Sequence, residues 1–262
     1  MLISSSENEL IKMTKKLKEK KYREELGLFV IEGAKIVEEA ISEKANIQNI
    51  LVCEELAKSN SNNLLEIINN ICKNNEVINV TKKVFELLSD VKNPQGILAI
   101  VKKEEKNEIK LNEDFYLLLD GIQDPGNIGT IIRTADSLNI KQIIVSKDTA
   151  DVYNPKVLRS TMGAIFRVNV IYTDLIDAVN KLKENNITVY ATDLKTDKSI
   201  YDADYKKAAV IIGNEANGVT QAVLDLSSEK IKIPMLGKTE SLNASVATSV
   251  ILYEVYRKNN WI

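Results

Sequence analysis

The sequence predicts an α/β protein with a large C-terminal domain around a mainly parallel sheet and a smaller N-terminal α/β domain. Apolar segments alternate with amphipathic ones along the second half of the chain. Segments such as "FYLLLDG" lack polar alternation, which is typical of parallel strands covered on both faces. The charged, aperiodic run "KKEEKNEIKLNED" separates the two halves. At 262 residues the chain is long enough for two such domains.

The N-terminal domain is expected over residues 1–103, followed by a linker over residues 104–114. It begins with a helix over Glu9–Arg23 that carries a strongly basic face. Strands are expected in 26–33, 47–55, 76–80 and 96–103, and helices in 63–72 and 81–91. This order describes one α/β unit.

The C-terminal domain is expected over residues 115–262. The predicted strands are 115–121, 141–146, 167–172, 188–193 and 208–213, with a short one at "IKI". The predicted helices are 127–138, 154–163, 174–186 and a last one that begins at Ser241. Ligands of such sheets bind beyond the carboxyl ends of the strands, so the polar loops that follow the strands are candidate sites.

Composition excludes several kinds of chemistry. The chain has no histidine, which removes Ser-His and Cys-His nucleophiles and histidine-ligated zinc. Its two cysteines, Cys53 and Cys72, are expected to be buried thiols, and no metal site is predicted. No apolar run approaches the ~20 residues that span a bilayer, and the N-terminus lacks the order of a signal peptide. We therefore expect a cytoplasmic protein without a membrane partner.

The first polar loop is "DGIQDPGNIGTIIRTA", after strand 115–121. The spacing of its glycines is not that of a dinucleotide or phosphate-loop motif. A turn with Asn127 as the helix N-cap explains most of the stretch. Arg133 lies near the loop end of the helix, where its guanidinium could reach a phosphate; a solvated surface arginine is the alternative.

Two further loops carry polar residues at strand ends. "GNEANG" places Glu215 directly after a buried strand, although an ordinary turn explains it equally well. In "IPMLGKTESLNASVA", Ser241 alone could cap the helix, which leaves Asn243 surplus, and Leu242, Val246 and Val250 mark an apolar face. The joint occurrence of the three loops predicts a site for a polar small molecule, with an arginine for a second, anionic substrate.

The same three stretches, "DPGNIGTIIRTA", "VIIGNEANGV" and "IPMLGKTESLNASVATSVILYEV", resemble the ordered motifs of the SpoU (TrmH-type) RNA ribose 2'-O-methyltransferases of the SPOUT superfamily. The front part is similar to the ribosomal-protein-like substrate-binding domain that many of these enzymes carry. The resemblance implies a trefoil knot, a homodimer and S-adenosylmethionine as cofactor. By position it implies a catalytic set of Asn127, Arg133, Glu215, Ser241 and Asn243, and cofactor contacts from Thr192, Leu194, Gly213, Ile233 and Leu242.

The basic face of the predicted first helix is an expected RNA contact in this context, through Lys15, Lys16, Lys18, Lys20, Lys21 and Arg23. Alone, such a charge run is typical of a solvated surface. A separate N-terminal domain favours large-subunit ribosomal RNA as the target. Alternatives are a transfer-RNA 2'-O-methyltransferase, a non-catalytic RNA-binding or ribosome-assembly protein, and a Rossmann-type nucleotide enzyme. The target nucleotide, its base and any role in antibiotic resistance are not readable from the residues.

Overall fold

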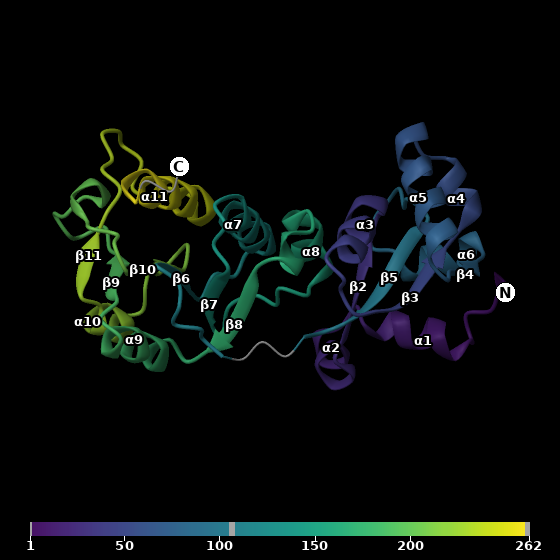
Figure 1. The fold of residues 1–262 in the computed structure, drawn as a ribbon, viewed down its shortest axis with the longest axis horizontal. Coiled ribbons are helices and arrows are strands. Elements are labelled where there is room, and N and C mark those ends of the chain that lie inside the picture. Colours follow the sequence, from purple (N-terminus) through teal and green to yellow (C-terminus); the bar gives the residue numbers. More distant parts are fainter. Residues whose placement is uncertain (1, 105–107, 260–262) are drawn as a thin grey trace. The chain divides into compact units, whose positions relative to one another are not determined.

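The computed structural model describes residues 2–104 and 108–259 and divides the chain into two compact units (Figure 1). The N-terminal unit contains Met1–Glu105 and Tyr153–Phe166, and the C-terminal unit contains Lys106–Val152 and Arg167–Ile262. The predicted linker includes residues 105–107, which lie outside the described residues, and the domain limits stay a prediction. No helix in the described parts of the chain is both long enough and apolar enough to cross a membrane.

The N-terminal unit is built on a five-stranded mixed sheet. The strand order is β1 (Leu2–Ile3), β4 (Ile78–Val80), β3 (Ile47–Val52), β5 (Ile97–Lys102) and β2 (Leu28–Glu32). Strand β5 is antiparallel to both of its neighbours, and β4 is parallel to its own. The helices are α1 (Glu9–Lys16), α2 (Lys20–Leu26), α3 (Ala34–Ser42), α4 (Glu54–Lys58), α5 (Asn62–Asn74), α6 (Lys82–Leu88) and α8 (Pro155–Thr161).

The predicted single helix over Glu9–Arg23 is wrong, because the chain breaks it into α1 and α2. Leu17 is buried in the core cluster that α1 and α6 form on the sheet, and Glu19 is extended. Arg23 is 2% exposed and its Nη1 donates to the carbonyls of Leu17 (2.8 Å) and Lys18 (2.7 Å). The buried guanidinium thus donates hydrogen bonds to carbonyl groups that the end of a helix leaves without partners.

The C-terminal unit confirms the predicted parallel sheet. Its six strands are all parallel, in the order β11 (Glu229–Ile231), β9 (Thr188–Thr192), β10 (Ala208–Gly213), β6 (Phe115–Asp120), β7 (Gln142–Ser146) and β8 (Asn169–Thr173). Every residue of β6 and β10 is buried, as their unbroken apolar sequence predicts. Helices α7 (Pro125–Ser137) and α11 (Ala244–Lys258) cover one face, and α9 (Leu175–Glu184) and α10 (Gln221–Leu226) cover the other (Figure 1).

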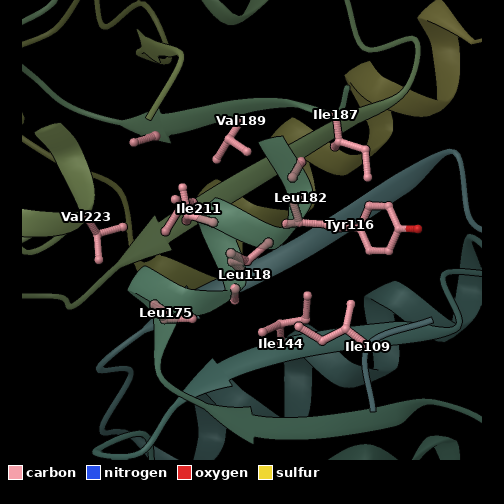
Figure 2. Packing of buried hydrophobic residues seen from close by; sticks show 14 of the residues in the cluster. Ile109, Tyr116, Leu118, Ile144, Leu175, Leu182, Ile187, Val189, Ile211 and Val223 are labelled. Atoms are coloured by element: carbon pink, nitrogen blue, oxygen red, sulfur yellow. The ribbon is translucent and has the colours of Figure 1, made fainter. Parts of the chain in front are cut away.

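A cluster of buried side chains holds α9 against this sheet (Figure 2). Leu118 and Ile211 from the two central strands meet Leu182 of α9, and Ile144 extends the cluster toward β7. Each such side chain contributes about 1.5–3 kcal/mol when it is removed from water. Short elements without a strong periodic pattern, such as β1, α4 and α10, were not predicted.

The strand order places a topological switch point between β6 and β10. From β6 the chain proceeds outward through β7 to β8, and then crosses to β9 on the other side before β10 fills the gap. The loops that follow β6 and β10 leave the carboxyl ends of neighbouring strands, the edge at which ligands of such sheets bind.

Candidate active site

Hydrogen bonds join the loops that follow β6 and β10 at the switch point. The Asn214 side-chain amide donates to the carbonyl of Gly121 (2.7 Å), and the backbone N–H of Thr220 donates to Asp120 Oδ2 (2.7 Å). Asn214 Oδ1 also accepts from the backbone of Ala216 (2.9 Å), so one side chain closes its own turn and holds the neighbouring loop. These contacts fix where Glu215 sits.

The loop after β6 ends in α7, whose N-cap differs from the prediction. Asp124, not Asn127, is the cap, and its Oδ1 accepts from the backbone N–H of Asn127 (2.9 Å). Pro125 then occupies the first helical position, where a missing N–H costs nothing. The prediction failed because Asp caps as well as Asn does. Because Asp124 caps the helix, the Asn127 side chain, which is 9% exposed, can bind other partners.

The loop after β11 ends in α11, and here too the predicted start is wrong. The helix begins at Ala244, and Asn243 is its cap: Oδ1 accepts from the backbone of Ser245 (3.0 Å) and Val246 (3.3 Å). Ser241 lies in the preceding loop and does not cap the helix. The predicted apolar face is also wrong, because Leu242 precedes the helix and Val246 is 48% exposed. The buried face carries Thr248, Ile251, Leu252 and Val255.

A chain of hydrogen bonds connects three of the predicted catalytic residues. Asn243 Nδ2 donates to Asn127 Oδ1 (3.0 Å), and Asn127 Nδ2 donates to Glu215 Oε1 (2.7 Å). Asn127 thus holds the carboxylate, and Asn243 holds Asn127. The second carboxylate oxygen of Glu215 makes no hydrogen bond within the described residues, so it is free to accept one from a ligand.

A pocket of about 720 Å³ opens beside this chain of hydrogen bonds. Glu215 and Ser241 line it, and so do all five predicted cofactor contacts, namely Thr192, Leu194, Gly213, Ile233 and Leu242. Buried apolar side chains such as Ile231 and Ile251 form part of the wall, while Asp193, Glu240 and Lys232 supply charge. Volume and lining are those of a small-molecule site.

Gly213 is required by a close approach of two backbone segments. A Cβ atom at this position would lie 2.1 Å from both Gly218 C and Val219 N. The segment after β10 returns onto the strand end through hydrogen bonds between the backbones of Asn214 and Gly218 (3.0 and 2.9 Å). This tight return forms one wall of the pocket.

Arg133 is not joined to the other predicted catalytic residues. It lies on the exposed side of α7, does not line the pocket, and makes no hydrogen bond or ion pair with any residue that the structure describes. The next residue of the same helix contacts α11, since Thr134 Oγ1 lies 3.3 Å from Ser249 Oγ. The guanidinium is therefore free to meet a group from outside this chain.

Some residues of the site were missed by reading the sequence. Asn214 was quoted within "GNEANG" but given no role, although an Asn that follows a buried strand is a recognisable turn former. Gln221 and Leu224 line the pocket from α10, a helix too short to show a periodic pattern. Within the described ranges, no group of three or more Cys, Asp or Glu residues is placed to hold a metal ion.

The predicted RNA-binding residues fall into two groups in the structure. Lys15, Lys16, Lys20 and Lys21 are exposed on α1 and α2, and the ring of Tyr22 lies 5.5 Å from Lys16 Nζ and 5.8 Å from Lys21 Nζ. Lys18 is half-buried and pairs with Asp90 (2.9 Å). Because Arg23 is buried at the break between α1 and α2, the exposed group consists of these four lysines, two of which lie beside the ring of Tyr22.

The geometry agrees with comparisons to known proteins. Residues 114–253 match the SpoU rRNA Methylase family, and residues 8–99 match the MRM3-like substrate binding domain. The chain belongs to the SpoU rRNA methylase family. It is 32% identical to the 23S rRNA (guanosine(2553)-2'-O)-methyltransferase RlmP of Bacillus subtilis (strain 168), over 97% of this chain and 98% of the relative.

Two solved methyltransferases share the fold over nearly the whole chain. The AdoMet-bound rRNA methyltransferase of Sinorhizobium meliloti superposes with a TM-score of 0.85 at 27% identity, covering 98% of this chain and 97% of the other. The SpoU methyltransferase AviRb of Streptomyces viridochromogenes, in complex with AdoMet, has a TM-score of 0.84 at 26% identity, with coverage of 97% and 99%.

The pocket of this chain suits such a cofactor. S-adenosylmethionine combines a flat aromatic base, a sulfonium cation and an amino-acid tail. The apolar wall with Ile231 and Ile251 suits the base, and the carboxylates of Glu215 and Glu240 suit a cation. The backbone groups at the end of β10 offer further hydrogen bonds at the carboxyl edge of the sheet, beside the loops that follow β9 and β11.

Proposed function

We propose that this protein is an S-adenosylmethionine-dependent RNA methyltransferase that methylates a ribose 2'-hydroxyl of large-subunit ribosomal RNA. The observation that carries the proposal is the chain of hydrogen bonds from Asn243 through Asn127 to Glu215, at the rim of the 720 Å³ pocket. The family and the rRNA activity named for the Bacillus subtilis relative support the same function.

The chain's own residues would position the reactants rather than react with them. Thr192, Leu194, Gly213, Ile233 and Leu242 would hold the cofactor, which supplies a methyl group made electrophilic by the sulfonium. Glu215, fixed by Asn127, would accept a hydrogen bond from the ribose or from the cofactor through its free oxygen. Ser241 and Asn243 lie on the loop and helix start beside the same pocket. Placing the hydroxyl oxygen in line with the methyl group supplies much of the rate.

The proton of the 2'-hydroxyl must leave when its oxygen takes the methyl group. Without histidine, Arg133 has two conceivable roles: a base, or a clamp on the 3' phosphate that stabilises a forming alkoxide while phosphate or water takes the proton. A guanidinium stays protonated below pH ~12, which favours the clamp. The exposure of Arg133, without a partner among the described residues, suits a group that waits for an RNA phosphate.

We further propose that Lys15, Lys16, Lys20 and Lys21 bind RNA phosphates, and that Lys18, which pairs with Asp90, contributes to the same surface. Ile11 and Leu17 are core residues, so deleting α1 would unfold the unit. The test is therefore a charge variant with the four lysines changed to Gln. Loss of four phosphate contacts should lower the salt slope of RNA binding by about 3–4 and leave cofactor affinity unchanged. An unchanged slope would contradict the assignment.

A homodimer is supported by an apolar stripe on α11. Val246, Val250 and Tyr253 recur at helical spacing, and Val246 and Tyr253 are exposed. A self-complementary surface of this kind is typical of two-fold dimers. Light scattering should give a dimer for the natural chain and a monomer for Val246→Glu; a monomeric natural chain would contradict the proposal.

The trefoil knot and the cellular location are proposed on the same family grounds. The crossover between β9 and β10 pairs with the segment after β11, since Ile200 N donates to the carbonyl of Lys232 (2.9 Å). The end of α11 returns to the same crossover, where Lys258 Nζ donates to the carbonyls of Tyr201 and Ala203 (2.6 and 2.7 Å). Such contacts suit a chain end threaded past this crossover. An rRNA substrate supports a cytoplasmic location.

Titration calorimetry of the purified protein with S-adenosylmethionine, and with NAD as comparison, tests the cofactor assignment. Binding of the first alone, at one site per chain, is expected. Transfer of a labelled methyl group to unmodified 23S rRNA, with transfer RNA as the comparison substrate, then tests the target. Resistance of the modified linkage to alkali identifies the 2'-O position. A folded protein that binds RNA but not the cofactor would instead be a non-catalytic RNA-binding protein.

A further inference from the structure

The N-terminal unit carries a recess of about 550 Å³. Its lining comes from the start of α3, the start of α5, Gln95 before β5, and the end of α8. We call it the α3–α8 groove. None of its lining residues belongs to the basic surface on α1 and α2 or to the cofactor pocket.

The charge in this groove is positive and unpaired. Lys35 is exposed and Arg159 is half-buried, and neither makes a hydrogen bond or ion pair with any residue in the described parts of the chain. The one carboxylate among the lining residues, Glu32, already accepts hydrogen bonds from Ser89 Oγ (2.6 Å) and from the backbone of Asp90 (3.2 Å). A half-buried guanidinium without a partner is costly, which favours an anionic ligand.

The rest of the lining combines an apolar wall with side-chain amides. Met162 is 51% exposed, and Leu64 and Ile36 lie in the same lining. Gln95 Oε1 accepts from the backbone of Ala34 (2.8 Å), and its amide nitrogen donates to no described residue. An apolar wall beside an amide donor is suited to an unstacked base, whose face needs covering and whose edge carries acceptors.

Helix α8 is fixed in this position by contacts with the N-terminal unit, although its sequence lies inside the methylase region. The ring of Tyr153 packs on Phe29 at 4.6 Å, and Lys103 Nζ lies 4.7 Å from the same ring. A Cβ atom at Gly163 would come within 2.8 Å of Glu39 Cγ, so the segment after α8 lies directly on α3. The groove is thus composite and does not depend on the substrate-binding segment alone.

We infer that the α3–α8 groove binds one unpaired nucleotide of the RNA substrate, outside the cofactor pocket. Lys35 and Arg159 would hold its phosphate, and the wall with Met162 and Leu64 would cover its base. The volume lies within the range of small-ligand pockets, about 300–1,000 Å³. The inference rests on the proposed function, because it identifies a second anchoring point for the same RNA.

The test uses the full chain and a short single-stranded oligouridine that carries 4-thiouridine. For Arg159→Gln we expect the dissociation constant to rise about tenfold, as for loss of one charged hydrogen-bonded contact. The salt slope should fall by about 0.7, the value for one phosphate of a single strand. Lys156→Gln is the matched control, since Lys156 is exposed on the same helix but does not line the groove. Photo-cross-links should map to the peptide that contains Met162.

Met162→Glu is a second variant that places a repelling charge in the groove at an already exposed position. Both variants should bind S-adenosylmethionine as the natural chain does, and methyl transfer to 23S rRNA should show a raised KM with an unchanged kcat. Natural affinity and slope in both variants, or cross-links confined to other peptides, would overturn the inference. If the natural chain binds oligouridine here but transfers no methyl group, the proposed function fails and the groove stands.

Discussion

Substitutions of Asn243 can separate an effect on stability from an effect on catalysis, because its side-chain oxygen and nitrogen make different contacts. Oδ1 caps α11 and Nδ2 donates to Asn127. Asn243→Ala removes both, at about 1 kcal/mol for the cap and about 1 kcal/mol for the hydrogen bond, so the free energy of unfolding should fall by about 2 kcal/mol. Asp174→Ala is the matched control, because Asp174 caps α9 on the other face of the sheet and should cost only about 1 kcal/mol.

Asn243→Asp is the decisive variant. A carboxylate keeps the cap and gains about 0.3–1 kcal/mol at a helix N-terminus, which offsets the lost hydrogen bond to Asn127, so stability should hardly change. The donor to Asn127 is gone, however, and a second negative charge lies near Glu215. With the amide of Asn127 no longer held, we expect the single-turnover methyl-transfer rate to fall about 100-fold. Urea unfolding and single-turnover kinetics measure the two effects; a natural rate in Asn243→Asp would refute the positioning role.

Three further predictions address the pocket, the pH dependence and the arginine. Gly213→Ala should abolish S-adenosylmethionine binding in calorimetry, because its Cβ would lie 2.1 Å from the Gly218–Val219 backbone, whereas Gly237→Ala, with nothing within 4 Å, should bind normally. Burial raises the pKa of the Tyr205 hydroxyl in the folded state. The stability that the protonated hydroxyl contributes is therefore complete below the unfolded-state pKa of about 10 and is lost as pH rises through the higher folded-state pKa. Urea unfolding at a series of alkaline pH values should show a smaller loss of stability for Tyr205→Phe than for the natural chain. Arg133→Lys should lose kcat steeply without losing cofactor affinity, and a rate that rises with hydroxide only in this variant would count against a pure clamp.

The fold was readable from the sequence where burial is complete. Strands β6 and β10 are buried at every residue, and their nearly unbroken apolar sequences predicted this. The first helix was misread because a basic pattern continues across the break at Leu17, whose burial depends on α6 and β5 far along the chain. The membership of α8 in the N-terminal unit has no local signal either, since it depends on contacts of Tyr153 and Gly163 with residues more than a hundred positions earlier.

The sequence predicted which residues belong to the site, but not which of them contact one another. Asp, Asn and Ser all cap helices, so the sequence offered several caps for α7 and α11 and no rule to choose between neighbours. In the structure Asp124 and Asn243 are the caps, and the Asn127 side chain contacts Glu215 instead of capping α7. Arg133 could be placed on its helix from spacing, but that it lacks a partner among the described residues is a fact of tertiary structure.

Asn243, which the helix cap alone would not require, can serve two roles because a primary amide has both an acceptor oxygen and a donor nitrogen. A serine or an aspartate at position 243 could cap α11, but Asp has no donor, and the shorter Ser side chain has one hydroxyl for both tasks. An amide accepts at one atom and donates at the other, so Asn243 can fix the helix start and Asn127 at once. Asn127 repeats the arrangement toward Glu215, accepting at Oδ1 and donating at Nδ2. A relay of this kind needs amides at both positions, which is why the residue that looked redundant for folding is the one that couples the helix to the site.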